Sequence, residues 1–251
     1  LDPYRRRITI AVSVLAGLAG GLSASSEWGS YLLWRNAVPF GITDPQFGLD
    51  LSFYTFTLPF IRFVISFAFV LVVVCLIVVA VVQYLYGGLR LQPRGDRATA
   101  AAQAQISVLI GLFVLLKAVS YWYDRFELVT QPQQLVAGFT GLKYTDVHAV
   151  LPALNIMVAV SLLVAVLFFV NAFRRHWAIP TIGAVLMVAS SLAIGTIYPI
   201  FVQQFQVRPS ELVKEQPYLD RNISATRDAY DIADADIEAY PGTVSAPTAQ
   251  T

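Results

Sequence analysis

One stretch constrains the fold more than any other. Residues 63–82, FVISFAFVLVVVCLIVVAVV, form an apolar run without a charged side chain. The hydrocarbon core of a bilayer is about 30 Å thick, and an α-helix needs about 20 apolar residues to cross it. In lipid an isolated segment must pair all its backbone groups internally, so this run is predicted to be helical despite its many β-branched residues. The rest of the chain must therefore fold around a membrane span.

The composition also indicates an integral membrane protein. Hydrophobic residues make up 57% of the chain and charged residues only 13%, whereas soluble domains carry about 25% charged residues. The net charge of +1 gives no sign of a nucleic-acid partner. Cys75 is the single cysteine, which excludes a disulfide framework and a cysteine metal site.

Five apolar stretches predict an all-α, polytopic transmembrane helix bundle. The predicted spans are residues 8–24, 58–86, 101–122, 151–173 and 179–201. They make residues 1–205 a transmembrane bundle, whose connections 25–57 and 123–150 lie on the same side of the membrane. Residues 206–251 are polar and acidic, and are expected to begin an extracytoplasmic domain or a linker.

Helical spacing predicts two further helices outside the spans. An interfacial helix is expected around Trp28, Tyr31, Leu32 and Arg35. An amphipathic helix with Leu219, Ile223, Thr226 and Tyr230 on one face is expected to dock on another part of the protein. In the first span, Gly17 and Gly21 have the small-xxx-small spacing that favours a helix partner over lipid.

The distribution of arginine predicts the orientation, because positive residues are retained on the cytoplasmic side. With five spans, eight arginines gather on one side: Arg5, Arg6, Arg7, Arg90, Arg94, Arg97, Arg174 and Arg175. The opposite connections hold only Arg35, Arg125 and Lys143. The chain is therefore expected to lie in a bacterial plasma membrane with its start in the cytoplasm and its end outside.

The candidate functional positions lie at the outer rim formed by the two aromatic connections. Arg62 and Lys117 are the strongly charged residues close to the span interiors, and the other charged candidates are Asp44, Asp50, Asp124, Arg125, Glu127 and Asp146. We expect Arg62 and Lys117 to act as a structural anchor or in an ion pair rather than in transport. A relay that moves protons or ions would show carboxylates or histidines near the middle of the membrane. The interfacial aromatic candidates are Trp28, Trp34, Tyr121 and Trp122.

No catalytic constellation is recognisable. The motifs of nucleotide-binding proteins, zinc proteases and hydrolases are missing from the sequence, so no enzyme activity, cofactor or metal is expected in this chain. His148 and Asp146 could form half of a metal site, but His148 is better read as a loop residue, and His176 is expected on the opposite side. Asn222-Ile-Ser224 fits the N-glycosylation pattern, which is frequent by chance.

Four stretches together resemble one family. They are residues 40–54 (FGITDPQFGLDLSFY), 116–126 (LKAVSYWYDRF), 139–152 (FTGLKYTDVHAVLP) and 208–230. Their order and placement are similar to those of uncharacterised protein family 0182, large bacterial integral membrane proteins prominent in actinobacteria. The resemblance implies two more spans before Leu1 and a large extracytoplasmic domain after about Tyr240. It implies no catalytic residues, because the family has no established activity.

These observations favour a membrane domain of a cell-envelope protein that anchors and orients an extracytoplasmic domain. The expected partners are the lipid bilayer and other membrane or envelope proteins, or further copies of the chain, for which it would act as a scaffold. The alternative is a transporter or channel subunit for an unknown solute or lipid. A water-accessible cavity between the spans would favour the alternative, and apolar packing would favour the anchor.

Overall fold

The computed structural model describes residues 2–89, 98–132, 140–174 and 178–235, with only the backbone described for part of the first helix. These residues form helices joined by loops, with isolated β-bridges as their only extended pairs. The α-helices are α1 (Asp2–Ser26), α2 (Trp28–Arg35), α3 (Leu58–Leu85), α4 (Ala100–Glu127), α5 (Leu151–Arg174), α6 (Ala178–Leu192), α7 (Tyr198–Phe201) and α8 (Glu211–Ala229).

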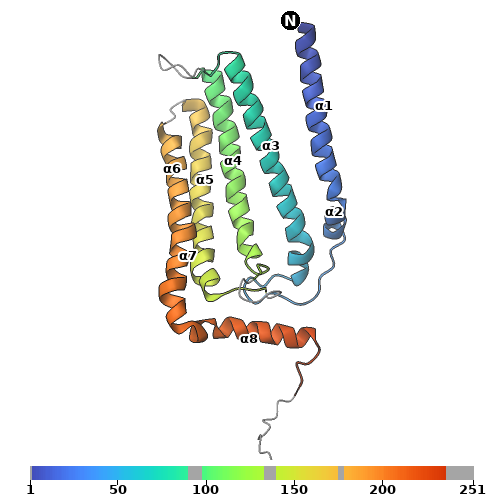
Figure 1. Ribbon diagram of the computed structural model, residues 1–251, viewed down its shortest axis with the longest axis vertical. Coiled ribbons are helices and arrows are strands. Elements are labelled where there is room, and N and C mark those ends of the chain that lie inside the picture. The colour runs from blue at the N-terminus through green and yellow to red at the C-terminus, as the bar shows by residue number, and fades with distance from the viewer. Residues whose placement is uncertain (1, 90–97, 133–139, 175–177, 236–251) are drawn as a thin grey trace, which may run out of the picture.

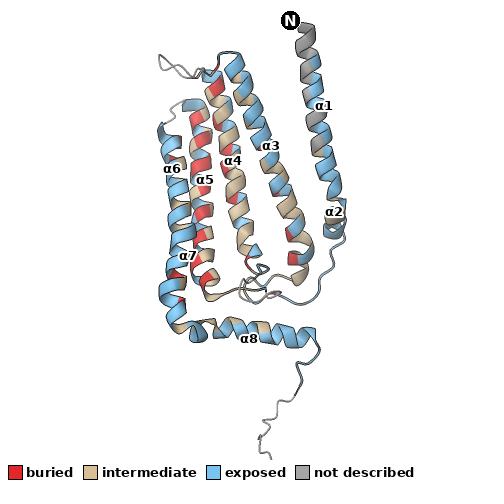
Figure 2. Ribbon diagram, viewed as in Figure 1, coloured by how far each residue is buried: buried red, intermediate tan, exposed pale blue. Residues whose placement is uncertain are grey.

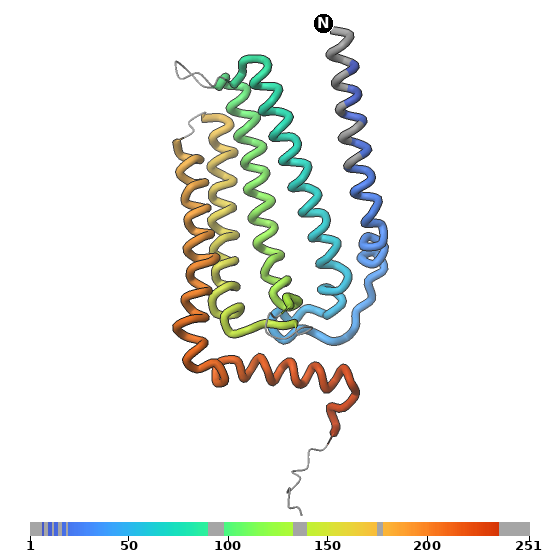
Figure 3. The backbone as a smooth tube through the Cα atoms, in the orientation of Figure 1, coloured from blue at the N-terminus to red at the C-terminus, as the bar shows by residue number. Residues whose placement is uncertain are grey.

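Four long helices stand side by side in one open row (Figure 1). Their order is α3, α4, α5, α6, and each packs mainly on its sequence neighbour. The tube view shows the same row, with α1 standing beside α3 and apart from it (Figure 3). The four helices therefore form a single layer, and no other described segment covers either broad face of it.

Burial is concentrated on α4 and α5, in the middle of the row (Figure 2). Val114 of α4 packs with Val164, Ala165 and Phe168 of α5 in an apolar cluster. Gly111 permits the close approach of these helices, because a Cβ there would lie 3.0 Å from Phe169 Cε1. Small residues at such contacts let van der Waals packing hold helices together in lipid, where the hydrophobic effect between helices is lost.

The described residues contain four helical segments that are long and apolar enough to cross a membrane, rather than the predicted five. They are Phe53–Leu85, Ala100–Glu127, Asp146–Arg174 and Ala178–Ala229. The predicted first span, 8–24, does lie in a helix, α1. Gly, Ala and Ser dilute its apolar character, and several of its side chains lie outside the described part. The prediction of a five-span bundle is thus corrected to four candidate spans in an open row.

Wide π-helical turns precede four of the prolines. These turns are Phe53–Thr57, Asp146–Val150, Ala193–Ile197 and Val202–Val207, and they are followed after one residue by Pro59, Pro152, Pro199 and Pro209. At the first of them, Leu58 N–H donates to Phe53 O, five residues back. Proline lacks the N–H for an α-helical bond, and its ring crowds the carbonyl four residues earlier. A preceding π-turn relieves this crowding without breaking the helix.

The last candidate span continues into α8 without a break in helical structure. The helical segment bends between α7 and α8, at residues 202–210, and α8 crosses the ends of α3, α4 and α5 (Figure 1). We call this end of the row, with the connections 36–57 and 128–150, the α8 end. The beginning of α1 lies at the opposite end (Figure 1).

Candidate functional site

The first connection is folded around two aspartates at the α8 end. The Asp50 carboxylate accepts hydrogen bonds from the N–H groups of Phe40, Gly41 and Ser52 at 2.8–3.0 Å. Asp44 is buried and accepts from Phe47 N–H at 2.6 Å and from the Tyr54 hydroxyl at 3.2 Å. Aspartate side chains commonly stabilise turns in this way, by accepting hydrogen bonds from backbone N–H groups nearby in the sequence. Both aspartates therefore act on their own loop.

The Asp50 interactions predict a pH dependence. The N–H of Phe40, followed by the hydroxyl and N–H of Ser52, holds the pKa of the Asp50 carboxyl at about 2, below its usual 3.8. A carboxyl whose pKa is lower in the folded state stabilises that state above pH 3.8, and the contribution is lost as the pH falls towards 2. We expect the protection of Phe40 and Gly41 against hydrogen exchange, measured relative to the unstructured rate at the same pH, to be constant above about pH 4 and to fall as the pH is lowered towards 2.

A matched pair of variants isolates this effect. Asp50→Asn should lower the protection of Phe40 and Gly41 throughout the pH range, since the charged acceptor is gone. Asp220→Asn, at an exposed position of α8, should change neither amide. Slow exchange in Asp50→Asn at pH 6 would contradict the assignment.

Arg62 joins the start of α3 to the end of α4. Its guanidinium forms ion pairs with Asp124, at 2.5 Å, and with Glu127. The charges face one another because Asp124 and Glu127 are three residues apart and share one face of α4. Phe126, in the same turn, packs edge-on against Phe47 and Phe53 of the first connection. Arg62 thus ties the start of α3 to the last turn of α4, and the same turn carries the aromatic contact with the first connection.

The other charged candidates are spread over separate contacts. Lys117 Nζ lies 4.6 Å from the centre of the Tyr121 ring and 5.8 Å from that of Phe69, so its stem directs the charge towards the α8 end. Arg125 donates to Asn155 Oδ1 at 2.9 Å and stacks on Trp122 at 3.6 Å. Asp146 accepts from Lys143 N–H at 2.9 Å.

The aromatic candidates of α2 flank the same region. Trp34 stacks on Phe60 at 4.7 Å, and Tyr31 lies 5.8 Å from the same ring. Trp28 is exposed. The structure therefore brings Trp34 to the start of α3 but leaves Trp28 at the surface.

The second connection holds α8 in place. The N–H of Tyr144 donates to both carboxylate oxygens of Glu215, at 3.0 and 3.3 Å. The ammonium of Lys214 lies 4.7 Å from the centre of the Tyr144 ring, whose other partner is His148, stacked at 4.0 Å. Thr145 donates its hydroxyl proton to Gln203. We call these contacts the α8 latch.

The face of α8 that meets the rest of the chain differs from the predicted one. Leu219, Ile223 and Tyr230, expected to dock, are exposed by 43–75%. The partly buried positions of α8 are Lys214, Glu215, Tyr218 and Asn222. The polar face of α8 packs inward because the groups that it meets, such as the Tyr144 N–H, are polar and need hydrogen-bond partners.

Asn222 is packed against the second connection. A Cβ at Gly141 would lie 3.0 Å from Asn222 Oδ1, and Asn222 Nδ2 donates to Tyr218 O at 2.9 Å. Gly141 has a φ of +141°, outside the region that L-residues favour. The amide that a glycan would modify is therefore engaged, which disfavours the N-glycosylation reading.

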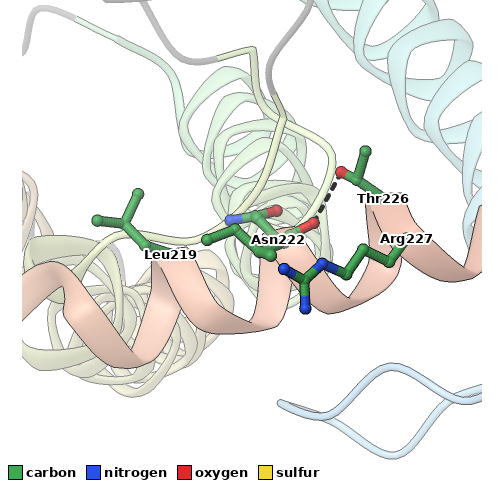
Figure 4. A pocket seen from close by; sticks show the side chains of 5 residues that line it. Leu219, Asn222, Thr226 and Arg227 are labelled. Atoms are coloured by element: carbon green, nitrogen blue, oxygen red, sulfur yellow. Dashed lines mark hydrogen bonds between the residues drawn. The ribbon is translucent and has the colours of Figure 1, made fainter. Parts of the chain in front are cut away.

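A cavity opens between the two connections and α8. It has a volume of about 460 Å³, and its wall includes Asp44, Tyr54, Leu142, Tyr218 and Arg221. A smaller hollow of about 210 Å³ lies along α8 beside it, with the side chains of Leu219, Asn222, Thr226 and Arg227 arranged along the helix (Figure 4). The cavity is the more enclosed of the two, and it joins elements distant in the sequence.

Sequence reasoning missed several residues that build this region. Tyr54, Glu215, Tyr218 and Arg221 were not among the candidates, because the cavity and the contacts of α8 form only where the two connections meet α8 in the folded chain. Glu215, Tyr218 and Asn222 recur at helical spacing (i, i+3, i+7), and this spacing could have indicated that they share one face of α8. Among the described residues no group of three or more His, Cys, Asp or Glu could hold a metal, and His176 lies outside them.

The sequence matches the Uncharacterised protein family (UPF0182) over residues 1–251. It is 51% identical over 240 residues to a UPF0182 protein of Nocardioides sp., and 48% identical over 244 residues to one of Streptomyces coelicolor, in both cases over 96% of this chain and 24% of the relative. A UPF0182 protein of Frankia alni is 49% identical over 250 residues, which is 100% of this chain and 24% of the relative. The chain thus spans about a quarter of the length of these relatives. No solved structure matches it.

Proposed function

We propose that this chain, which belongs to the uncharacterised protein family UPF0182, is the membrane domain of a cell-envelope protein. In this proposal it anchors and orients an extracytoplasmic part. One observation carries the proposal: the last candidate span runs as continuous helix into α8. The α8 latch then fixes that helix across the end of the row through Glu215 and Gln203. Whatever follows α8 would leave the membrane in a defined direction.

The finer topology is part of the proposal. The arginine-rich beginning of the chain lies at the end of the row opposite α8 (Figure 1). Positive residues are retained on the cytoplasmic side, so this end would lie in the cytoplasm of a bacterial plasma membrane and the α8 end outside.

Cysteine labelling tests this proposal. In intact protein carrying Cys75→Ala, a membrane-impermeant maleimide added to intact cells should label Ser224→Cys on α8. It should label Ala100→Cys, at the start of α4, only after the cells are permeabilised. Both positions are exposed, so accessibility to the reagent depends on the side of the membrane. The reverse pattern would put α8 in the cytoplasm and end the anchoring proposal.

The open row supports a partner in the membrane. Large apolar side chains on both outer helices are exposed, among them Val70 and Ile77 of α3 and Leu186 of α6. Lipid can cover such faces, and so can another membrane or envelope protein or a second copy of the chain. We therefore keep a larger assembly, with the chain as scaffold, as part of the proposal.

The alternative, a transporter or channel subunit, has less support. In the contact between α4 and α5, Val114, Val164 and Phe168 form an apolar cluster. The buried polar pair beside it is closed, because Asn171 Nδ2 donates to Ser107 Oγ at 2.9 Å. Arg62 is engaged by two carboxylates at the α8 end, and Lys117 points its charge to the same end. Neither residue lines a described cavity between the spans. An enzyme activity, if the protein has one, would have to use residues outside the apolar row.

A further inference from the structure

The cavity at the α8 end has the composition of a binding site. Its volume of about 460 Å³ falls within the range of about 300–1,000 Å³ typical of small-ligand pockets. Most of its wall is apolar, with Ile42, Leu51, Val129 and Leu142 contributed by the two connections. Such walls suit a hydrocarbon part of a ligand.

The charges on the wall are not equivalent. Asp44 is 4% exposed, and its Oδ2 atom is engaged within its own loop, where it accepts from Gln46 N–H, Phe47 N–H and the Tyr54 hydroxyl. Arg221 is exposed and lies 5.6 Å from the Tyr218 ring, and within the described residues no carboxylate forms an ion pair with it. The charged group that the cavity offers most directly to a ligand is therefore the Arg221 guanidinium.

The position of the cavity indicates where the ligand comes from. Tyr54 lies at the start of the candidate span Phe53–Leu85, and Trp34 and Trp122 belong to the same end of the row. Tryptophan and tyrosine prefer the headgroup level of a bilayer. The cavity thus opens near the depth at which lipid headgroups meet their acyl chains.

We infer that this cavity binds an anionic phospholipid, with the phosphodiester on Arg221 and the first part of an acyl chain against Ile42, Leu51 and Leu142. An arginine fork matches the geometry of phosphate oxygens. The inference goes beyond the proposed anchoring role and does not depend on which side of the membrane α8 occupies. A bound lipid would fill the space between both connections and α8.

Lipid binding to the intact protein tests the inference. The protein is purified in a neutral detergent, and short-chain phosphatidylglycerol, phosphatidylcholine and inorganic phosphate are titrated separately while bound species are counted by native mass spectrometry. Both lipids carry the phosphodiester, but the choline ammonium of phosphatidylcholine offsets its charge and would be repelled by Arg221. We therefore expect phosphatidylglycerol to bind roughly tenfold or more tightly than phosphatidylcholine. R221Q should abolish this preference.

The matched control is R227Q. Arg227 lies on the same helix and is exposed, but it borders the small hollow and not the cavity (Figure 4). Its variant should bind phosphatidylglycerol as the wild type does. An unchanged preference in R221Q, or equal binding of both lipids by the wild type, would overturn the inference. Binding of inorganic phosphate as tight as that of phosphatidylglycerol would overturn the acyl-chain part and leave a free-anion site.

Discussion

Replacing Arg62 by Gln is expected to lower the free energy of unfolding of the membrane domain by about 1–3 kcal/mol. Removing one partner of a buried ion pair costs about 3–5 kcal/mol, because the other charge stays behind. Here the side chains of Arg62, Asp124 and Glu127 are 21%, 28% and 48% exposed, so solvent screening reduces the cost. The measurement is reversible unfolding in mixed micelles of a mild and a denaturing detergent.

Two further variants separate charge from packing. Arg35→Gln removes an exposed arginine of α2 and should leave the unfolding free energy unchanged within about 0.5 kcal/mol. Combining Arg62→Gln with Asp124→Asn and Glu127→Gln removes the orphaned charges and should recover part of the loss. If the triple variant is less stable than Arg62→Gln alone, the ion pairs are not the cause.

Replacing Gly111 by Leu should destabilise the domain by about 3 kcal/mol or prevent its assembly. A Cβ at this position would already lie 3.0 Å from Phe169 Cε1 and 3.3 Å from Phe168 Cβ. The remaining leucine atoms would push α4 away from α5, and the apolar cluster around Val164 would open. Gly111→Ala, which adds only the Cβ, should cost less, and both values come from the same detergent unfolding.

Gly21→Leu in α1 is the control for this substitution. Nothing lies within 4 Å of a Cβ built at Gly21, so the substitution adds its first atom in open space. No loss of stability is expected, and leucine, as the better helix former, could add up to about 1 kcal/mol. Equal losses for Gly111→Leu and Gly21→Leu would mean that the α4–α5 contact is not specifically tight.

The sequence was sufficient for the helical class and for most of the candidate spans. Hydropathy over 58–86 identifies α3 because lipid imposes both a length and a helical backbone on an apolar run. The same reasoning overstates the count at 8–24. That stretch is helical in α1, but glycine and serine reduce its apolar character, and the described residues contain four candidate spans.

The packing of these helices could not be read from hydropathy. An apolar side chain satisfies lipid and a neighbouring helix equally well, so the sequence does not distinguish the buried Val164 from the exposed Val166. The open row follows from contacts such as that of Gly111 with Phe169, which are set by shape. For the same reason the small residues of α1 predict a close helix partner, whereas among the described residues no atom lies within 4 Å of a Cβ built at Gly17 or Gly21.

The candidate site was predictable in part. Charge and position identified Arg62 and a set of acids, but the choice of Asp124 and Glu127 depends on the relative rotation of α3 and α4. The apolar stripe of α8 indicated the wrong docking face, because the receiving surface offers backbone N–H groups such as that of Tyr144. A helix that docks through hydrogen bonds leaves its apolar stripe exposed.

The π-turns before Pro59, Pro152, Pro199 and Pro209 change the rotation of each helix about its axis relative to the segment that precedes the turn. One additional residue in a helix turns everything beyond it by roughly 100° about the axis. Arg62 follows the turn Phe53–Thr57 by five residues, so that turn decides which way its guanidinium points relative to the loop held by Asp44 and Asp50. The prolines therefore set how far the helices of the row are rotated about their axes relative to the loops and to α8 at the end of the row.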